Sequence, residues 1–146
     1  MNFLKIFSVG ILLLGASEMN AQNKETTKEK PVDNPPKCNM IKDGKFIKTN
    51  YPESLWYMTV KENVQTEYYN SGKDYIKSTL VFVDDCNYKS IVVEKSEKEN
   101  PIKVGDVFSN KILATQDDYL KIQTQLNGDS FDFVLAKVKE NKKSKK

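Results

Sequence analysis

The chain has 146 residues, and its 23 basic residues, all of them lysine, stand against 20 acidic ones. It contains neither histidine nor arginine. Without histidine it cannot form a Ser-His-Asp arrangement and lacks the commonest zinc and haem ligand; without arginine it lacks the fork that most often binds phosphate and guanine. We therefore expect no catalytic residue, no metal site, no cofactor and no nucleic-acid partner.

Residues 1–21 have the layout of a secretory signal peptide. Lys5 supplies a positive start, residues 3–14 are mostly apolar, and small residues follow up to Ala21. The apolar run stops well short of the ~20 residues that a membrane-spanning helix needs. We expect cleavage after Ala21, a mature chain of 22–146 without a transmembrane segment, and a secreted or periplasmic protein.

The rest of the chain divides into three parts by composition. Residues 22–37 are charged and contain three prolines but almost no apolar side chain, which is typical of a disordered linker. Residues 38–138 hold the apolar residues and predict one domain. Residues 139–146 form a basic tail that we expect to be flexible. Because residues 137–146 contain six lysines and one glutamate, the excess positive charge belongs to this end, and the domain itself is mildly acidic.

From residue 38 onward, apolar residues recur at every second position, as in strands with one buried face. In 55–63, for example, Trp56, Met58 and Val60 share a face. Eight such stretches are joined by short links, and they span 44–49, 55–63, 64–69, 74–83, 86–95, 107–116, 118–126 and 130–138. The sequence therefore predicts an all-β domain, an antiparallel up-and-down meander of about eight strands forming a small barrel or half-barrel. A two-sheet β-sandwich is the alternative, and the strand order stays open.

Turn residues separate these stretches. Asn127-Gly128-Asp129 predicts a hairpin turn, since glycine and asparagine tolerate positive φ.

Two adjacent acidic pairs, Asp84-Asp85 and Asp117-Asp118, also fall between predicted strands. Two carboxylates can bind calcium or divide acid and base roles, as in a carboxylate-based hydrolase. Aspartate is also a common turn residue because its side chain caps local backbone amides. Neither pair has the spacing of a calcium-binding loop. We favour the structural role and regard a hydrolase as the least favoured function.

Cys38 precedes the first predicted strand and Cys86 opens the fifth. An even cysteine count in an exported chain favours a disulfide, which would stabilise the fold by up to about 4 kcal/mol on the loop-entropy model. Two unpaired thiols or a redox pair are the alternatives. Because the spacing is not Cys-x-x-Cys, we favour a structural bridge.

Aromatic and polar side chains of the central strands supply the candidate binding residues, which are Trp56, Tyr57, Gln65, Glu67, Tyr68, Tyr69, Tyr75, Phe82 and Tyr88. Four of the tyrosines follow three successive strands. An exposed aromatic stripe on a sheet can stack on sugar rings or on a partner protein. Ordinary packing and cross-strand pairing explain most strand tyrosines, and we favour that interpretation here.

Gln65 and Glu67 lie on one side of a short predicted strand. If this side faces inward, it places a polar spot inside a small barrel, as a ligand cavity would. If it faces outward, it is ordinary solvated surface. Val64 and Thr66, which alternate with them, have only a weak claim on the core, and we favour the outward placement.

Three segments, CNMIKDGKF (38–46), WYMTVKENVQTEYY (56–69) and DDCNYKSIVVEK (84–95), resemble a group of small secreted proteins of Gram-negative bacteria. The shared pattern is a signal peptide and a cysteine, followed by Gly-x-Phe, Gln-x-Glu and Cys-x-Tyr strands. In this chain the pattern falls on Gly44 and Phe46, Gln65 and Glu67, and Cys86 and Tyr88. The resemblance covers residues 38–138 and implies an all-β exported domain without implying an activity.

Members of that group sometimes carry the label of a DNA topoisomerase. That chemistry requires a much longer chain, a tyrosine among basic and metal-binding groups, and a cytoplasmic location, so we do not extend the label to this chain. The group is similar in strand count to lipocalin-like barrels, but this sequence lacks their Gly-x-Trp start motif.

These observations favour a non-catalytic exported binding domain, most simply a monomer. Its ligand would be a small apolar molecule in the concave face or a protein partner on the tyrosine-rich strands. The alternative is a structural or envelope-associated module that works through protein contacts. A cavity lined by Trp56, Met58, Phe82 and Phe133 would favour the small ligand, whereas a packed interior with a flat aromatic patch would favour the module.

Overall fold

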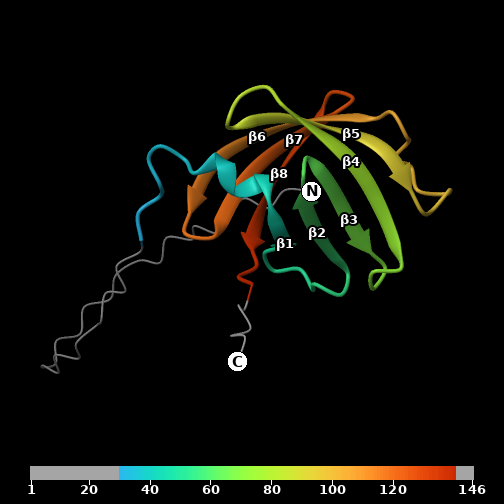
Figure 1. Ribbon diagram of the computed structural model, residues 1–146, viewed down its shortest axis with the longest axis horizontal. Helices are drawn as coiled ribbons and strands as arrows, with labels where there is room; N and C mark the ends of the chain where they lie inside the picture. The colour runs from blue at the N-terminus through green and yellow to red at the C-terminus, as the bar shows by residue number, and fades with distance from the viewer. Residues whose placement is uncertain (1–29, 141–146) are drawn as a thin grey trace, which may run out of the picture.

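Eight antiparallel strands follow one another around a closed barrel in the computed structural model, which describes residues 30–140 (Figure 1). The elements are η1 (Cys38–Lys42), β1 (Gly44–Lys48), β2 (Trp56–Lys61), β3 (Val64–Tyr69), β4 (Asp74–Phe82), β5 (Asn87–Lys95), β6 (Val107–Gln116), β7 (Tyr119–Leu126) and β8 (Asp129–Lys137). The predicted all-β meander is confirmed, and the barrel rather than the sandwich is its architecture. The predicted signal peptide, the linker before residue 30 and the tail after residue 140 lie outside the described residues.

Pairing between the first and last strands closes the barrel. Phe46 of β1 lies opposite Lys137 of β8, and Lys48 lies opposite Leu135. Every strand therefore has two neighbours, and the sheet has no free edge.

Tight turns keep the meander regular. Glu62-Asn63 and Asn127-Gly128 each supply two consecutive residues with positive φ, at 50° and 60° in the first pair and 52° and 89° in the second. This is the type I′ pattern, whose twist matches that of a hairpin. Asp129, expected within the second turn, instead begins β8.

The two ends of the barrel differ, because successive connections of a meander lie at opposite ends. One end, here called the η1 end, carries η1 and the β2–β3, β4–β5 and β6–β7 connections. The other end, here called the mouth, carries the remaining connections, including the β5–β6 loop of residues 96–106. In Figure 1 this loop projects at the right, away from η1.

The interior is filled at the η1 end. Ile41 of η1 is fully buried, at 0% exposure, in one hydrophobic cluster with Phe46, Val60 and Leu120 of the barrel strands. The 3-10 helix therefore acts as a plug that completes the core of this half.

A disulfide between Cys38 and Cys86 ties the plug to the β4–β5 connection, with the two Cα atoms 5.1 Å apart. The predicted bridge is confirmed. Because it joins residues 48 positions apart, the loop-entropy model assigns it a stabilisation of about 4 kcal/mol.

Residues 30–37, which belong to the predicted linker, lie against the C-terminal end of β6. The Asp33 amide donates to the Thr115 carbonyl at 2.9 Å, and the Lys37 amide donates to the Thr115 hydroxyl at 2.8 Å. The same hydroxyl donates to the Asp33 carboxylate at 2.9 Å. This part of the predicted linker therefore has defined contacts with the barrel.

Both acidic pairs take part in turns or surface ion pairs. Asp84 Oδ1 accepts hydrogen bonds from the amides of Cys86 and Asn87, at 2.9 and 2.8 Å. Asp117 has a positive φ of 52° in the β6–β7 turn, and Asp118 pairs with Lys139 at 3.0 Å. The structural role that we favoured agrees with these contacts.

Truncating the plug tests how much it supports the barrel. Ile41→Ala removes a fully buried side chain, and we expect it to lower the free energy of unfolding by about 2–5 kcal/mol in urea titrations. The matched control is Val83→Ala, because Val83 is 67% exposed and its loss is expected to change stability by less than about 0.5 kcal/mol. Equal effects of the two substitutions would contradict the role of η1 as a plug.

Acid sensitivity of the β4–β5 turn follows from the hydrogen bonds to Asp84. The donors from Asn87 and Cys86 lower the pKa of Asp84. Its stabilising contribution is therefore complete above about pH 4, where the unfolded group ionises, and is lost as the pH falls through the lower folded-state pKa. Asp84→Asn keeps an oxygen acceptor but cannot titrate, so we expect the fall in Tm on acidification to be smaller in this variant.

The control for this effect is Asp85→Asn. The Asp85 side chain is 90% exposed and its nearest cation, Lys42, lies 3.8 Å away. Thermal melts at several pH values between 2 and 6 should show a wild-type acid dependence for Asp85→Asn. If the Tm of Asp84→Asn falls with acidification as steeply as that of the wild type, the role assigned to Asp84 in this turn is wrong.

Candidate functional site

A cavity of about 230 Å³ occupies the barrel interior toward the mouth. Its apolar lining comes from β2, β6, β8 and the β5–β6 loop, and consists of Trp56, Met58, Ile102, Phe108, Phe131, Phe133 and Leu135. Its polar lining comes from β1, β3, β5, β6 and β7, and consists of Lys48, Gln65, Glu67, Tyr88, Ser90, Asn110 and Thr124. The barrel interior is thus hollow toward the mouth and filled by side chains at the η1 end.

Glu67 organises one wall of the cavity. Trp56 Nε1 donates to Glu67 Oε2 at 3.1 Å, and Gln65 Nε2 donates to Glu67 Oε1 at 2.9 Å. Both carboxylate oxygens are therefore used to hold an indole and an amide in place.

The favoured outward placement of Gln65 and Glu67 is wrong. Gln65 is buried at 7% exposure and both side chains line the cavity, whereas Val64 on the outer face is 39% exposed. The physical reason is the hydrogen-bonded set with Trp56, which satisfies polar groups that would otherwise be costly to bury.

Lys48 lies at the mouth among aromatic rings. Its Nζ is 4.3 Å from the centroid of Trp56, 5.8 Å from Tyr51 and 5.9 Å from Phe133. Burial lowers the pKa of Lys48, and the nearby charge of Glu67 offsets part of this effect. The ring faces stabilise the ammonium group by cation–π contact.

The opposite wall carries a second hydrogen-bonded set. Asn110 Nδ2 donates to Ser90 Oγ, and Thr124 Oγ1 donates to Asn110 Oδ1, both at 2.7 Å. Burial raises the pKa of Tyr88, and the charge of Glu67 adds to this. Tyr88 is therefore a neutral phenol at physiological pH and presents a hydroxyl rather than a phenolate.

The β5–β6 loop covers part of the mouth and contributes Ile102 to the cavity lining. Lys95 Nζ donates to the carbonyls of Asn100 and Ile102, at 2.8 and 2.7 Å. Asn100 Nδ2 donates to the Tyr69 hydroxyl at 3.1 Å, and this hydroxyl donates to Glu97 at 3.0 Å. The loop is thus fixed to the end of β5 and to β3.

Three of the predicted binding tyrosines form a row on the outer wall. Tyr57 and Tyr68 stack with ring centroids 4.7 Å apart, and Tyr68 lies opposite Tyr75 on β4. Lys45 Nζ lies 4.5 Å from the Tyr57 centroid, and Tyr75 donates to Glu94. The row is partly buried by its own neighbours.

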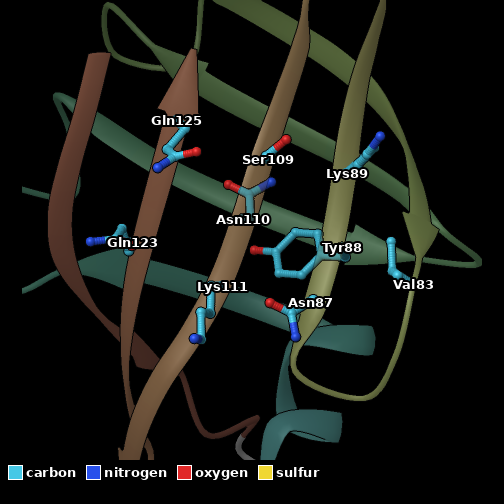
Figure 2. A pocket seen from close by; sticks show the side chains of 9 residues that line it. All are labelled: Val83, Asn87, Tyr88, Lys89, Ser109, Asn110, Lys111, Gln123 and Gln125. Carbon is cyan, nitrogen blue, oxygen red and sulfur yellow. The ribbon is translucent and has the colours of Figure 1, made fainter. Parts of the chain in front are cut away.

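Two other hollows lie on the outer surface. Figure 2 shows the first, which lies across β5, β6 and β7. Polar side chains such as Lys89, Lys111 and Gln123 surround the point where Tyr88 of β5 lies opposite Asn110 of β6 in the strand register. Its lining is largely polar.

The second outer hollow is at the η1 end and includes Asp43, Asp118 and Glu140 together with Lys137 and Lys139. Across residues 30–140, no three acidic or cysteine side chains converge as metal ligands. Neither outer hollow joins several aromatic and aliphatic side chains in a deep space, so the barrel cavity is the candidate site.

The structure separates the candidate binding residues into groups. Trp56, Gln65, Glu67 and Tyr88 line the cavity, and Tyr69 lies at its mouth. Tyr57, Tyr68 and Tyr75 form the outer row described above. Phe82 lies outside the cavity lining and packs on Tyr88, with ring centroids 5.4 Å apart.

Sequence reasoning missed Lys48, Ser90, Asn110 and Thr124 as cavity residues. Thr124 shares the inward face with Leu120 and Ile122, so strand alternation could have found it. Asn110 and Ser90 are polar positions inside otherwise apolar alternation, which is the signal that was available for them.

No family model, curated protein or solved structure matches this chain. The resemblance to small secreted bacterial proteins therefore stays a prediction. None of the helices formed by residues 30–140 has the length and apolar character needed to cross a membrane.

The attachment of the β5–β6 loop can be tested through Lys95. Lys95→Met removes the ammonium that donates to three loop carbonyls, those of Lys98, Asn100 and Ile102, and hydrogen bonds from charged groups stabilise by about 1.5–3 kcal/mol. We expect amide hydrogen exchange in residues 97–104 to accelerate about tenfold while exchange in the strands is unchanged. Lys98→Met, in the same loop, is the control and should leave exchange at the wild-type rate.

Proposed function

We propose that the protein is an exported, non-catalytic binding protein that takes a small, mainly apolar molecule into the barrel cavity. The observation that carries this proposal is the cavity itself, which lies between a filled half of the barrel and a mouth partly covered by a loop. Concave, mostly apolar sites with a few placed polar groups are typical of small-molecule binding.

The cavity volume limits the size of the ligand. An engineered apolar cavity of about 150 Å³ holds benzene, which has six non-hydrogen atoms. By the same ratio, a cavity of about 230 Å³ holds about nine non-hydrogen atoms. Larger ligands would extend through the mouth beside Lys48 and Phe131, which is 49% exposed.

The lining supports binding rather than bond cleavage. Among the side chains of residues 30–140, Glu67 supplies the only carboxylate that lines the cavity, and its two oxygens accept hydrogen bonds from Trp56 and Gln65. A glycosidase-type mechanism needs a second carboxylate across the bond that is cleaved.

Export is proposed from the predicted signal peptide together with the disulfide. Cys38 and Cys86 are joined, and stable disulfides are typical of proteins in oxidising compartments. A secreted or periplasmic location follows from both features.

A protein-interaction module is the alternative, with the outer tyrosine row as its surface. The aromatic faces and hydroxyls of that row make contacts with one another and with Lys45 and Glu94. Because these contacts are already satisfied within the barrel wall, we favour the cavity as the functional site.

Trp56 offers a direct test, because it is the only tryptophan of the chain and it lines the cavity. Octan-1-ol has an apolar body of the size that the cavity accepts. We expect titration with octan-1-ol to produce a saturable, one-to-one change in Trp56 emission. Native mass spectrometry of protein taken from its own culture should show a co-purifying small molecule.

Two matched substitutions separate cavity binding from surface adsorption. Thr124→Phe fills space inside the barrel, since Thr124 is buried at 4% exposure, whereas Gln125→Phe adds the same ring to the exposed outer face. With both variants folded by circular dichroism, we expect only Thr124→Phe to abolish the Trp56 response. A wild-type response in both would show that octan-1-ol binds elsewhere.

A further inference from the structure

The ammonium group of Lys48 has no acceptor in the described part of the chain. It contacts the faces of Trp56, Tyr51 and Phe133 but donates no hydrogen bond and pairs with no carboxylate there. Ring faces stabilise a cation without using its N–H donors. Lys48 therefore offers a charge and three donors at the point where the cavity opens.

Glu67 does not take up these donors. Its two oxygens accept from Trp56 Nε1 at 3.1 Å and from Gln65 Nε2 at 2.9 Å. These two bonds orient the carboxylate along the wall of β2 and β3. The negative charge lies near enough to lower the cost of partly burying the ammonium, but it leaves the ammonium donors free.

Neutral donors on the opposite wall add to this surplus. The Ser90 hydroxyl accepts from Asn110, which leaves its own proton free to donate. Tyr88 also lines the cavity, and its hydroxyl, which is not fully enclosed, has no hydrogen-bond partner within residues 30–140. A cavity with more donors than acceptors fits a ligand that brings acceptors.

We propose that the ligand of this cavity carries an anionic head group, a carboxylate, which Lys48 binds at the mouth while the apolar body lies against Trp56 and Phe133. This inference rests on the proposed function and specifies the class of its ligand. The fit is to a monocarboxylate with an apolar body of about eight carbons, since the interior accepts about nine non-hydrogen atoms.

Three probes of equal chain length test the proposal, namely octanoate, octan-1-ol and octylammonium. They differ only in the head group, so their affinities report what the mouth recognises. We expect octanoate to bind most tightly, octan-1-ol about tenfold more weakly, and octylammonium most weakly, by isothermal titration calorimetry at pH 7. A charge-assisted hydrogen bond accounts for a factor of this size.

Lys48→Met keeps the length of the apolar stem and removes the charge. We expect it to weaken octanoate binding about tenfold and to change octan-1-ol binding by less than about twofold. Lys48→Arg restores the charge and should retain the preference for octanoate. Lys45→Met is the matched control, because Lys45 lies on the same strand over the ring of Tyr57 but on the outer wall, and it should leave all three affinities unchanged.

The outcomes distinguish the two proposals. If none of the three probes binds, the proposed function fails and the inference about the head group fails with it. If octanoate and octan-1-ol bind equally well and Lys48→Met changes neither, the cavity binds small molecules but the carboxylate assignment is wrong. Tightest binding of octylammonium would overturn the assignment in favour of a cationic ligand that replaces Lys48 among the three rings.

Discussion

The site depends on one constraint: side chains fill the barrel interior at one end and leave it hollow at the other. An eight-stranded barrel has an interior just wide enough for side chains or one small ligand. At the η1 end, Ile41 supplies the apolar volume that the strands themselves do not, and the Cys38–Cys86 bridge holds it there. Within residues 30–140, no corresponding plug lies at the mouth. The cavity is thus what remains when a single 3-10 helix completes only half of the core.

Much of this architecture could be predicted from local sequence patterns. Strand alternation gave the eight elements, with bounds within one or two residues of those observed for most strands, because the face that a side chain occupies depends on its parity within a strand. Turn residues such as Asn127-Gly128 gave the hairpin connections for the same local reason. Closure was beyond such patterns, because pairing of β1 with β8 joins residues such as Phe46 and Lys137 across most of the chain.

The candidate site was predicted only in part, because the barrel interior does not follow a simple division into apolar inside and polar outside. Gln65 and Glu67 are inside because Glu67 accepts hydrogen bonds from both Trp56 and Gln65. Asn110 is inside because Ser90 and Thr124 lie within reach on neighbouring strands. Each of these hydrogen-bonded sets forms only when neighbouring strands are in register. No single stretch of sequence therefore shows which polar side chains face inward. The cost of burying polar groups is met by partners from other strands.

The described chain both starts and finishes at the η1 end. Residues 30–37 lie against the end of β6, and the Val138 amide donates to the Lys45 carbonyl as the chain leaves β8. Attachment close to residue 30 or residue 140, whether to a resin, a bilayer or a fused partner, would leave the cavity mouth on the side of the molecule away from the attachment. The cavity of an immobilised protein would therefore stay open to dissolved molecules, and no added spacer would be needed between the protein and the support.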